Sequence, residues 1–404
     1  MKKAFLASIP MTLGSIALTI GYKTLLAHLI PKTQLALFFT LIDMLAFVML
    51  LFVGFRSAMV VAYQQTQDDV TILNLFRLVL GAATLLSLLL MIPWINITFH
   101  EHLPWEELVV LVIAFSLYVY GSNQLSMYRR YTLMNILTVL EPCSVIASFG
   151  LAYFLGLRSY SLLFLSAVMG NLILVGIIHF AKHRHHPEPP FKLPPLTPQA
   201  KQFLRNAFIA SAEFAAGVAV MYGAVMALAS WGTPHELGDF QVVTKTLFMS
   251  LITLFVFPIF KFALPELSLL MSKNEKKTIQ GYTRWIIRYA LSVQALVTAL
   301  IVIGGEKLIT SLFGQDYHDA YGDILMLSSF IGLSILNGYA IALLRASGHF
   351  GTSFAVRLSG VLGFLMLILF LKDHFSVSNT VIFSLGFSYL PMTLLSLFLA
   401  RKYL

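Results

Sequence analysis

Charged residues are scarce in this sequence. Asp, Glu, Lys and Arg make up 11% of its 404 residues, whereas hydrophobic residues make up 58%. An ordinary soluble domain has roughly 25% charged and 45–50% apolar residues, so the composition excludes one. Cysteine is scarcer still. Cys143 stands alone, which excludes an intrachain disulfide, and its apolar surroundings predict a buried small residue.

The sequence also lacks the motifs of common catalytic sites. It has no GxxxxGK[ST] phosphate loop, no HExxH metal motif and no nucleophile beside a base. The loops between its apolar runs are too short to form a separate catalytic domain. We therefore expect no enzyme, no metal site, no cofactor and no ATPase engine in this chain, which leaves transport driven by an ion gradient or by substrate supply.

Apolar runs of about 20 residues are abundant, and that length crosses roughly 30 Å of hydrocarbon as a helix. They predict an all-α integral membrane protein with about twelve transmembrane helices, near residues 4–27, 33–55, 70–92, 106–127, 134–156, 159–180, 203–230, 239–260, 283–303, 322–344, 350–371 and 379–400. The first run follows two lysines but is too long for a secretory signal, so we expect a retained helix.

Lysine and arginine are distributed unevenly between alternate loops. Of the 27 such residues, 21 lie on the side of the amino terminus. Cytoplasmic loops are enriched in these cations, so both termini are predicted to lie in the cytoplasm. The same bias explains the net charge of +9 through contact with anionic lipid, and we expect no nucleic-acid partner.

One polar segment, residues 182–200, interrupts the apolar pattern. It predicts a cytoplasmic linker between an amino-terminal six-helix lobe, 1–181, and a carboxy-terminal six-helix lobe, 201–404. Three histidines in the linker are typical of a metal tract or of a flexible basic loop beside headgroups, and we favour the loop. They are His183, His185 and His186.

Two lysines fall inside predicted spans, where a charge costs about 2.5–3.5 kcal/mol. Lys23 ends a polar stripe of the first helix, and Lys245 lies about two turns into the eighth. Both indicate a cavity that accepts an anionic substrate. The alternatives are contact of Lys23 with outer headgroups and a structural ion pair for Lys245.

Two carboxylates also fall within spans. Asp43 lies about halfway along the second and Glu213 about midway along the seventh. A partly desolvated carboxylate in a cavity is suited to ion or proton coupling, and structural pairing is the alternative. Prolines at 142, 258 and 265 predict bends in the fifth span and at the end of the eighth.

Several motifs together resemble polysaccharide flippases of the Wzx type, within the superfamily of multidrug, oligosaccharidyl-lipid and polysaccharide exporters. Leu312–Gly348 begins LFGQDYHDA and ends ASG; Gly238–Leu267 contains Lys245 and ends LPEL; Gly54–Val60 reads GFRSAMV. The resemblance implies a V-shaped fold of two six-helix bundles with a central cavity and alternating access. It implies movement of an undecaprenyl diphosphate-linked oligosaccharide to the outer leaflet of the bacterial inner membrane.

The same resemblance implies that Lys23, Arg56 and Lys245 hold the diphosphate. From their place inside spans, Asp43 and Glu213 are the residues that we expect to couple transport to protons or sodium ions. Peptidoglycan-precursor flippases typically carry two more helices, so that substrate ranks lower. One alternative is a cation-coupled multidrug exporter of the same superfamily, to which the acidic residues are suited. Another is a membrane-embedded glycan transferase or polymerase, which the short outer loops disfavour.

Overall fold

The computed structural model describes residues 2–99, 105–128, 130–157, 159–183, 188–195, 197–257, 267, 270–271, 275–347 and 350–401. Within these ranges the secondary structure is helical, without strands. The predicted bend at Pro258 and Pro265 and the linker residues His185 and His186 lie outside the described residues.

The helices are long and follow one another with short connections. They are α1 (Lys2–Leu29), α2 (Lys32–Thr66), α3 (Asp69–Phe99), α4 (Trp105–Met127), α5 (Tyr131–Phe154), α6 (Ser159–His183), α7 (Pro198–Trp231), α8 (Pro234–Gly238), the π-helix η1 (Asp239–Thr244), α9 (Lys245–Phe255), α11 (Lys276–Phe313), the 3-10 helix η2 (Gln315–Tyr317), α12 (Ala320–Ser328), α13 (Ile331–Ala346), α14 (Phe350–Leu371), α15 (Val377–Phe387) and α16 (Tyr389–Ala400).

The predicted spans coincide with these helices. In the described part of the chain, eight helices or helix pairs are long and apolar enough to cross a membrane, and α12 with α13 makes a ninth. The other three predicted spans correspond to α1, α2 and the α8–η1–α9 segment. Large apolar side chains are exposed on the helices, including Ile303 at 82% and Met366 at 71%, as expected for surfaces that face lipid. The fold is therefore that of an all-α, multi-pass membrane protein.

The chain divides into two compact units. Unit 1 comprises residues 1–22 and 38–215, and unit 2 comprises residues 23–37 and 216–404, so α1, α2 and α7 each contribute to both. The predicted division into lobes 1–181 and 201–404 remains a prediction.

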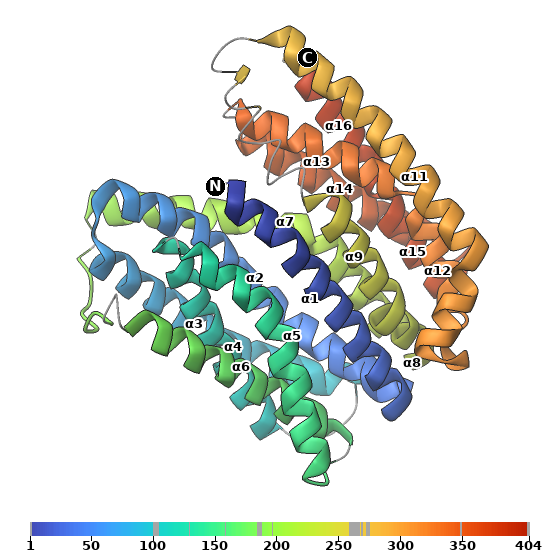
Figure 1. The fold of residues 1–404 in the computed structure, drawn as a ribbon, viewed down its shortest axis with the longest axis horizontal. Helices are drawn as coiled ribbons and strands as arrows, with labels where there is room; N and C mark the ends of the chain where they lie inside the picture. Colours follow the sequence, from blue (N-terminus) through green and yellow to red (C-terminus); the bar gives the residue numbers. More distant parts are fainter. Residues whose placement is uncertain are drawn as a thin grey trace. The chain divides into compact units, whose positions relative to one another are not determined.

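In unit 1, α6 packs against α4 and α5, and α3 packs against α4 (Figure 1). Phe55 of α2 is fully buried; its ring stacks on Phe76 of α3 and meets the edges of Phe203 and Phe208 of α7. The α2–α7 contact is close, because a Cβ atom on Gly54 would lie 2.3 Å from the Cα atom of Ser211. Small residues permit such approaches between membrane helices.

One residue of unit 1 departs from its prediction. Cys143 of α5 is partly exposed, so the prediction of a buried residue was wrong. The fifth span carries apolar residues on most of its faces, and hydropathy alone does not distinguish a face that contacts other helices from one that contacts lipid.

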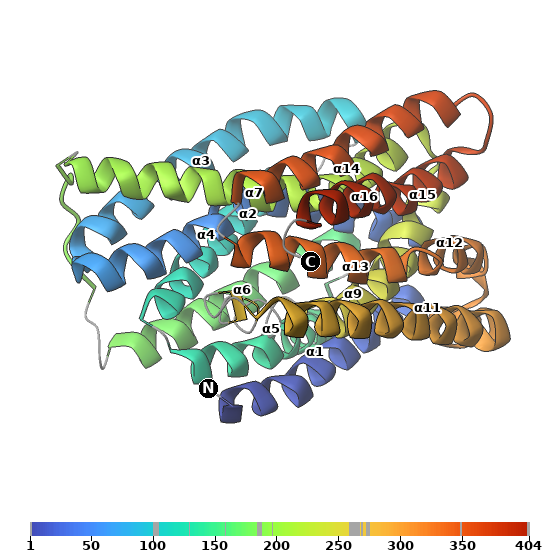
Figure 2. The ribbon, with the colours of Figure 1, turned by 90° about the horizontal axis from the view of Figure 1, so that it is seen from above.

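In unit 2, α16 packs against α13 and α14, and α13 packs against α11 (Figure 2). The α12–α13 pair is bent by 44°. Gln294 of α11 bridges the break: its Nε2 donates to the Ser328 carbonyl at 2.8 Å, and its Oε1 accepts from the Gly332 N–H at 2.8 Å. One side chain thus satisfies the backbone groups that the interrupted helix exposes.

Candidate functional site

Two of the predicted substrate-binding cations meet in unit 2. Lys23, near the end of α1, donates from Nζ to the backbone carbonyl of Gln241 at 2.7 Å. Lys245, the first residue of α9, donates from Nζ to Oε1 of the same glutamine at 3.3 Å. The Lys245 ammonium also lies 5.8 Å from the centre of the Tyr222 ring on α7. Three helical segments therefore bring two cations to one buried amide residue.

The local backbone explains why Gln241 is available to both lysines. Gln241 lies within η1, where the helix widens to a π-helix, and this residue is 0% exposed. The preceding short helix α8 starts with a capping box, in which Thr233 and Glu236 exchange side-chain to backbone hydrogen bonds, and Pro234 follows the cap. Single π-helical turns within α-helices are frequent at functional sites because they shift the direction of side chains.

A buried ion pair, between residues that were not predicted as site residues, lies at the start of the same segment. Nζ of Lys32 is 2.7 Å from Oδ1 of Asp239, and both side chains are 7% exposed. Lys32 also donates to the Asp316 carbonyl at 2.7 Å and lies 5.0 Å from the centre of the Tyr317 ring. The only sequence signal was that both charges stand at the same predicted end of their spans.

The loop between α11 and α12 belongs to the LFGQDYHDA motif. Its Tyr317 ring is buried, and burial raises the pKa of the Tyr317 hydroxyl, which stays neutral beneath the Lys32 ammonium. His318 is exposed and lies 2.9 Å from Glu306; hydrogen bonds to Glu306 and Asp319 raise the pKa of the His318 imidazole. The loop that carries this motif thus follows α11 and packs against the Lys32–Asp239 pair.

The third predicted cation, Arg56, belongs to unit 1. Its Nε donates to Oδ1 of Asn123 at 3.0 Å and its Nη2 to the Ser122 hydroxyl at 3.2 Å. Asn123 and Ser122 belong to α4, and the hydroxyl of Tyr118, also on α4, donates to Glu141 of α5 at 3.1 Å. Arg56 is thus held against α4 by side-chain amide and hydroxyl groups, with its side chain partly buried.

The two predicted coupling carboxylates occupy different helices of unit 1. Glu213, 8% exposed, follows the α2–α7 contact at Ser211 by two residues. Asp43 is half-buried on α2, eleven residues before Gly54. At 1.5 Å per residue, the two carboxylates differ in level by on the order of 10–15 Å along the helices. The structure therefore does not join them in one ion site.

A family match covers most of the chain. Residues 34–322 match the family model described as polysaccharide biosynthesis protein. No curated protein matches the sequence.

Solved structures with a similar fold include a lipid flippase and multidrug transporters. The lipid II flippase MurJ, in an inward closed conformation, aligns with a TM-score of 0.79 at 14% identity, over 98% of this chain and 87% of MurJ. An inward-facing multidrug resistance MATE family transporter of the MOP superfamily aligns with a TM-score of 0.70 at 14% identity, over 97% and 94%. A point mutant of the Vibrio cholerae MATE transporter VcmN aligns with a TM-score of 0.69 at 13% identity, over 99% of this chain and 96% of that transporter.

Proposed function

The chain belongs to the polysaccharide biosynthesis protein family, and from this premise we propose that it is a flippase for undecaprenyl diphosphate-linked oligosaccharide. It moves this lipid from the cytoplasmic to the outer leaflet of the bacterial inner membrane by alternating access, with both of its termini in the cytoplasm. The match of its fold to the lipid II flippase and to MATE transporters supports a transport function.

The observation that carries the proposal is the meeting of Lys23 and Lys245 at Gln241. A diphosphate presents two adjacent anionic groups, and each ammonium is suited to one of them through charge-assisted hydrogen bonds. Two cations at one place favour a doubly anionic ligand over a cationic drug. Arg56, on unit 1, is the third cation that we assign to the substrate.

Asp43 and Glu213 are the groups proposed to couple transport to a proton or sodium gradient. Their different levels on α2 and α7 imply two separate ion sites rather than one shared site. The multidrug exporter is the second candidate, because MATE transporters share the fold. Drug sensitivity of a deletion strain, with normal surface polysaccharide, would favour that candidate.

The direct test removes both charges at Gln241. We expect Lys23→Gln with Lys245→Gln to abolish surface polysaccharide at normal expression, because the diphosphate loses both cations. Lys372→Gln, on an exposed lysine of unit 2 after α14, is the matched control and should export normally. Normal polysaccharide in the double variant would contradict the proposal.

A further inference from the structure

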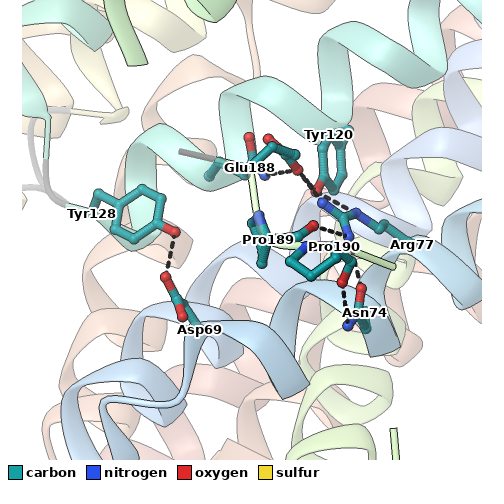
Figure 3. Close-up of polar contacts among 9 residues, drawn as sticks. Asp69, Asn74, Arg77, Tyr120, Tyr128, Glu188, Pro189 and Pro190 are labelled. Carbon is teal, nitrogen blue, oxygen red and sulfur yellow. Dashed lines mark hydrogen bonds and ion pairs between the residues drawn. The ribbon is translucent and has the colours of Figure 1, made fainter. Parts of the chain in front are cut away.

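A short stretch of the predicted linker is fastened to unit 1 by polar contacts (Figure 3). The Glu188 carboxylate contacts the Arg77 guanidinium and the Tyr120 hydroxyl, and Gln124 Nε2 donates to it at 3.0 Å. All three donors converge on one oxygen, Oε1. Arg77 Nη1 also donates to the Pro189 carbonyl at 2.9 Å.

The donors are fixed on regular helices that pack against each other. Arg77 belongs to α3, and Tyr120 and Gln124 are one turn apart on α4. Arg77 is further oriented by its Nε, which donates to the Tyr120 hydroxyl at 2.7 Å, and by its Nη1, which donates to Asn74 at 2.7 Å. Phe76 stacks on the Tyr120 ring and holds it in place. This donor set is therefore held by helix packing and by contacts that do not involve the linker.

The acceptor, Glu188, lies in contrast in a segment without regular secondary structure. Residues 188–195 form no helix or strand, and the Glu188 side chain is 37% exposed while that of Arg77 is 19% exposed. Two prolines follow Glu188, and a residue before proline is restricted to extended conformations. The carboxylate is therefore presented on a conformationally restricted segment outside the helices.

We propose that Arg77, Tyr120 and Gln124 form a binding site for phosphate oxyanions, which Glu188 occupies in this structure as a tethered competitor. One guanidinium N–H of Arg77, a hydroxyl and an amide N–H converge on one oxygen, and these are donors that a phosphate group accepts from. When the Glu188–Pro190 segment leaves, the same donors take a phosphate of a lipid headgroup or of a soluble diphosphate. Use of the site to load a lipid-linked substrate rests on the proposed function; binding of phosphate does not.

The test measures phosphate binding by the full-length protein in a neutral detergent. Sodium diphosphate is titrated calorimetrically, and retention of phosphatidylglycerol relative to phosphatidylcholine is measured by native mass spectrometry. We expect Glu188→Gln to bind at least one probe about fivefold more tightly than the wild type, because removing a tethered competitor raises the fraction of open sites. Tighter binding of diphosphate identifies a site that binds the free oxyanion. Tighter binding of phosphatidylglycerol alone identifies a site for a lipid headgroup.

Two further variants separate this site from a purely structural clamp. Glu106→Gln removes one exposed carboxylate from the other end of α4 and should bind both probes as the wild type does. Arg77→Gln in the Glu188→Gln background should abolish the gain. If Glu188→Gln lowers only the melting temperature and binds neither probe more tightly than the wild type, the site is a clamp and the proposal is wrong. That comparison stands even if the double variant fails to fold, and it is independent of polysaccharide export.

Discussion

Gln241 is a neutral residue between two cations, and its neutrality is part of the proposed site. Its backbone carbonyl accepts from Lys23 and its side-chain oxygen from Lys245. An amide oxygen orients an ammonium without cancelling its charge, whereas a carboxylate would neutralise it. The Gln241 side chain therefore orients Lys245 without neutralising its ammonium.

Gln241→Glu is expected to lower polysaccharide export by about tenfold or more, which corresponds to about 1.4 kcal/mol of lost substrate attraction. The added carboxylate competes with the diphosphate for the Lys245 ammonium and places a negative charge on the residue whose backbone carbonyl binds Lys23. Surface polysaccharide is measured at matched expression, with Gln280→Glu on the exposed face of α11 as the charge control. Export by Gln241→Glu equal to that of the control would show that the lysines do not hold the substrate through their charge.

Part of the site could be predicted at the scale of residues. Charges are costly in a membrane span, so the sequence distinguishes Lys23 and Lys245 as candidates for a site. Their meeting was not predictable, because Lys23 and Gln241 are 218 positions apart and only tertiary packing joins them. Lys32 and Asp239 were missed because each stands at the end of a span, where a charge is ordinary.

At the scale of elements, helix positions followed directly from hydropathy. All twelve predicted spans coincide with helices, because backbone groups in hydrocarbon must bond within their own segment. The breaks within helices could not be predicted from hydropathy. The π-helical turn η1 and the bend between α12 and α13 have no proline to indicate them, and the latter is held open by Gln294 from another helix.

The bend between α12 and α13 should depend on that glutamine. Gln294→Leu leaves the Ser328 carbonyl and the Gly332 N–H without this partner, and each unsatisfied buried group costs about 1–3 kcal/mol. We expect the free energy of unfolding to fall by about 2–4 kcal/mol, measured by thermal unfolding in detergent. Gln280→Leu, on the same helix but exposed, should change it little. Equal stability of the two variants would refute the bridging role.

The contact between α2 and α7 should not tolerate a side chain at Gly54. Gly54→Ala places a Cβ atom against the backbone of Ser211, so the helices must separate, at a cost of about 1–3 kcal/mol or more. Gly81→Ala is the control, because a Cβ at Gly81 of α3 meets nothing within 4 Å and alanine favours a helix by about 0.5–1 kcal/mol. Melting temperatures that fall for Gly54→Ala and do not fall for Gly81→Ala are expected; the reverse order would contradict the close contact.

At the scale of the whole molecule, a fold is shared with proteins that are only 13–14% identical. Such sharing is possible because lipid-facing positions require only an apolar residue, while a few small and polar positions fix the packing. Gly54 and Gln294 are examples of those positions here. The family resemblance read from three short motifs is confirmed by the match over residues 34–322, but these motifs carry no information on the glycan.

The measurement that tests the central claim most directly is mass spectrometry of lipid-linked intermediates in a deletion strain, alongside its surface polysaccharide. The account predicts that undecaprenyl diphosphate-linked oligosaccharide of normal length accumulates while polysaccharide is missing outside, and that wild-type protein but not the Lys23→Gln, Lys245→Gln variant reverses both. Unchanged intermediates together with normal surface polysaccharide would contradict it.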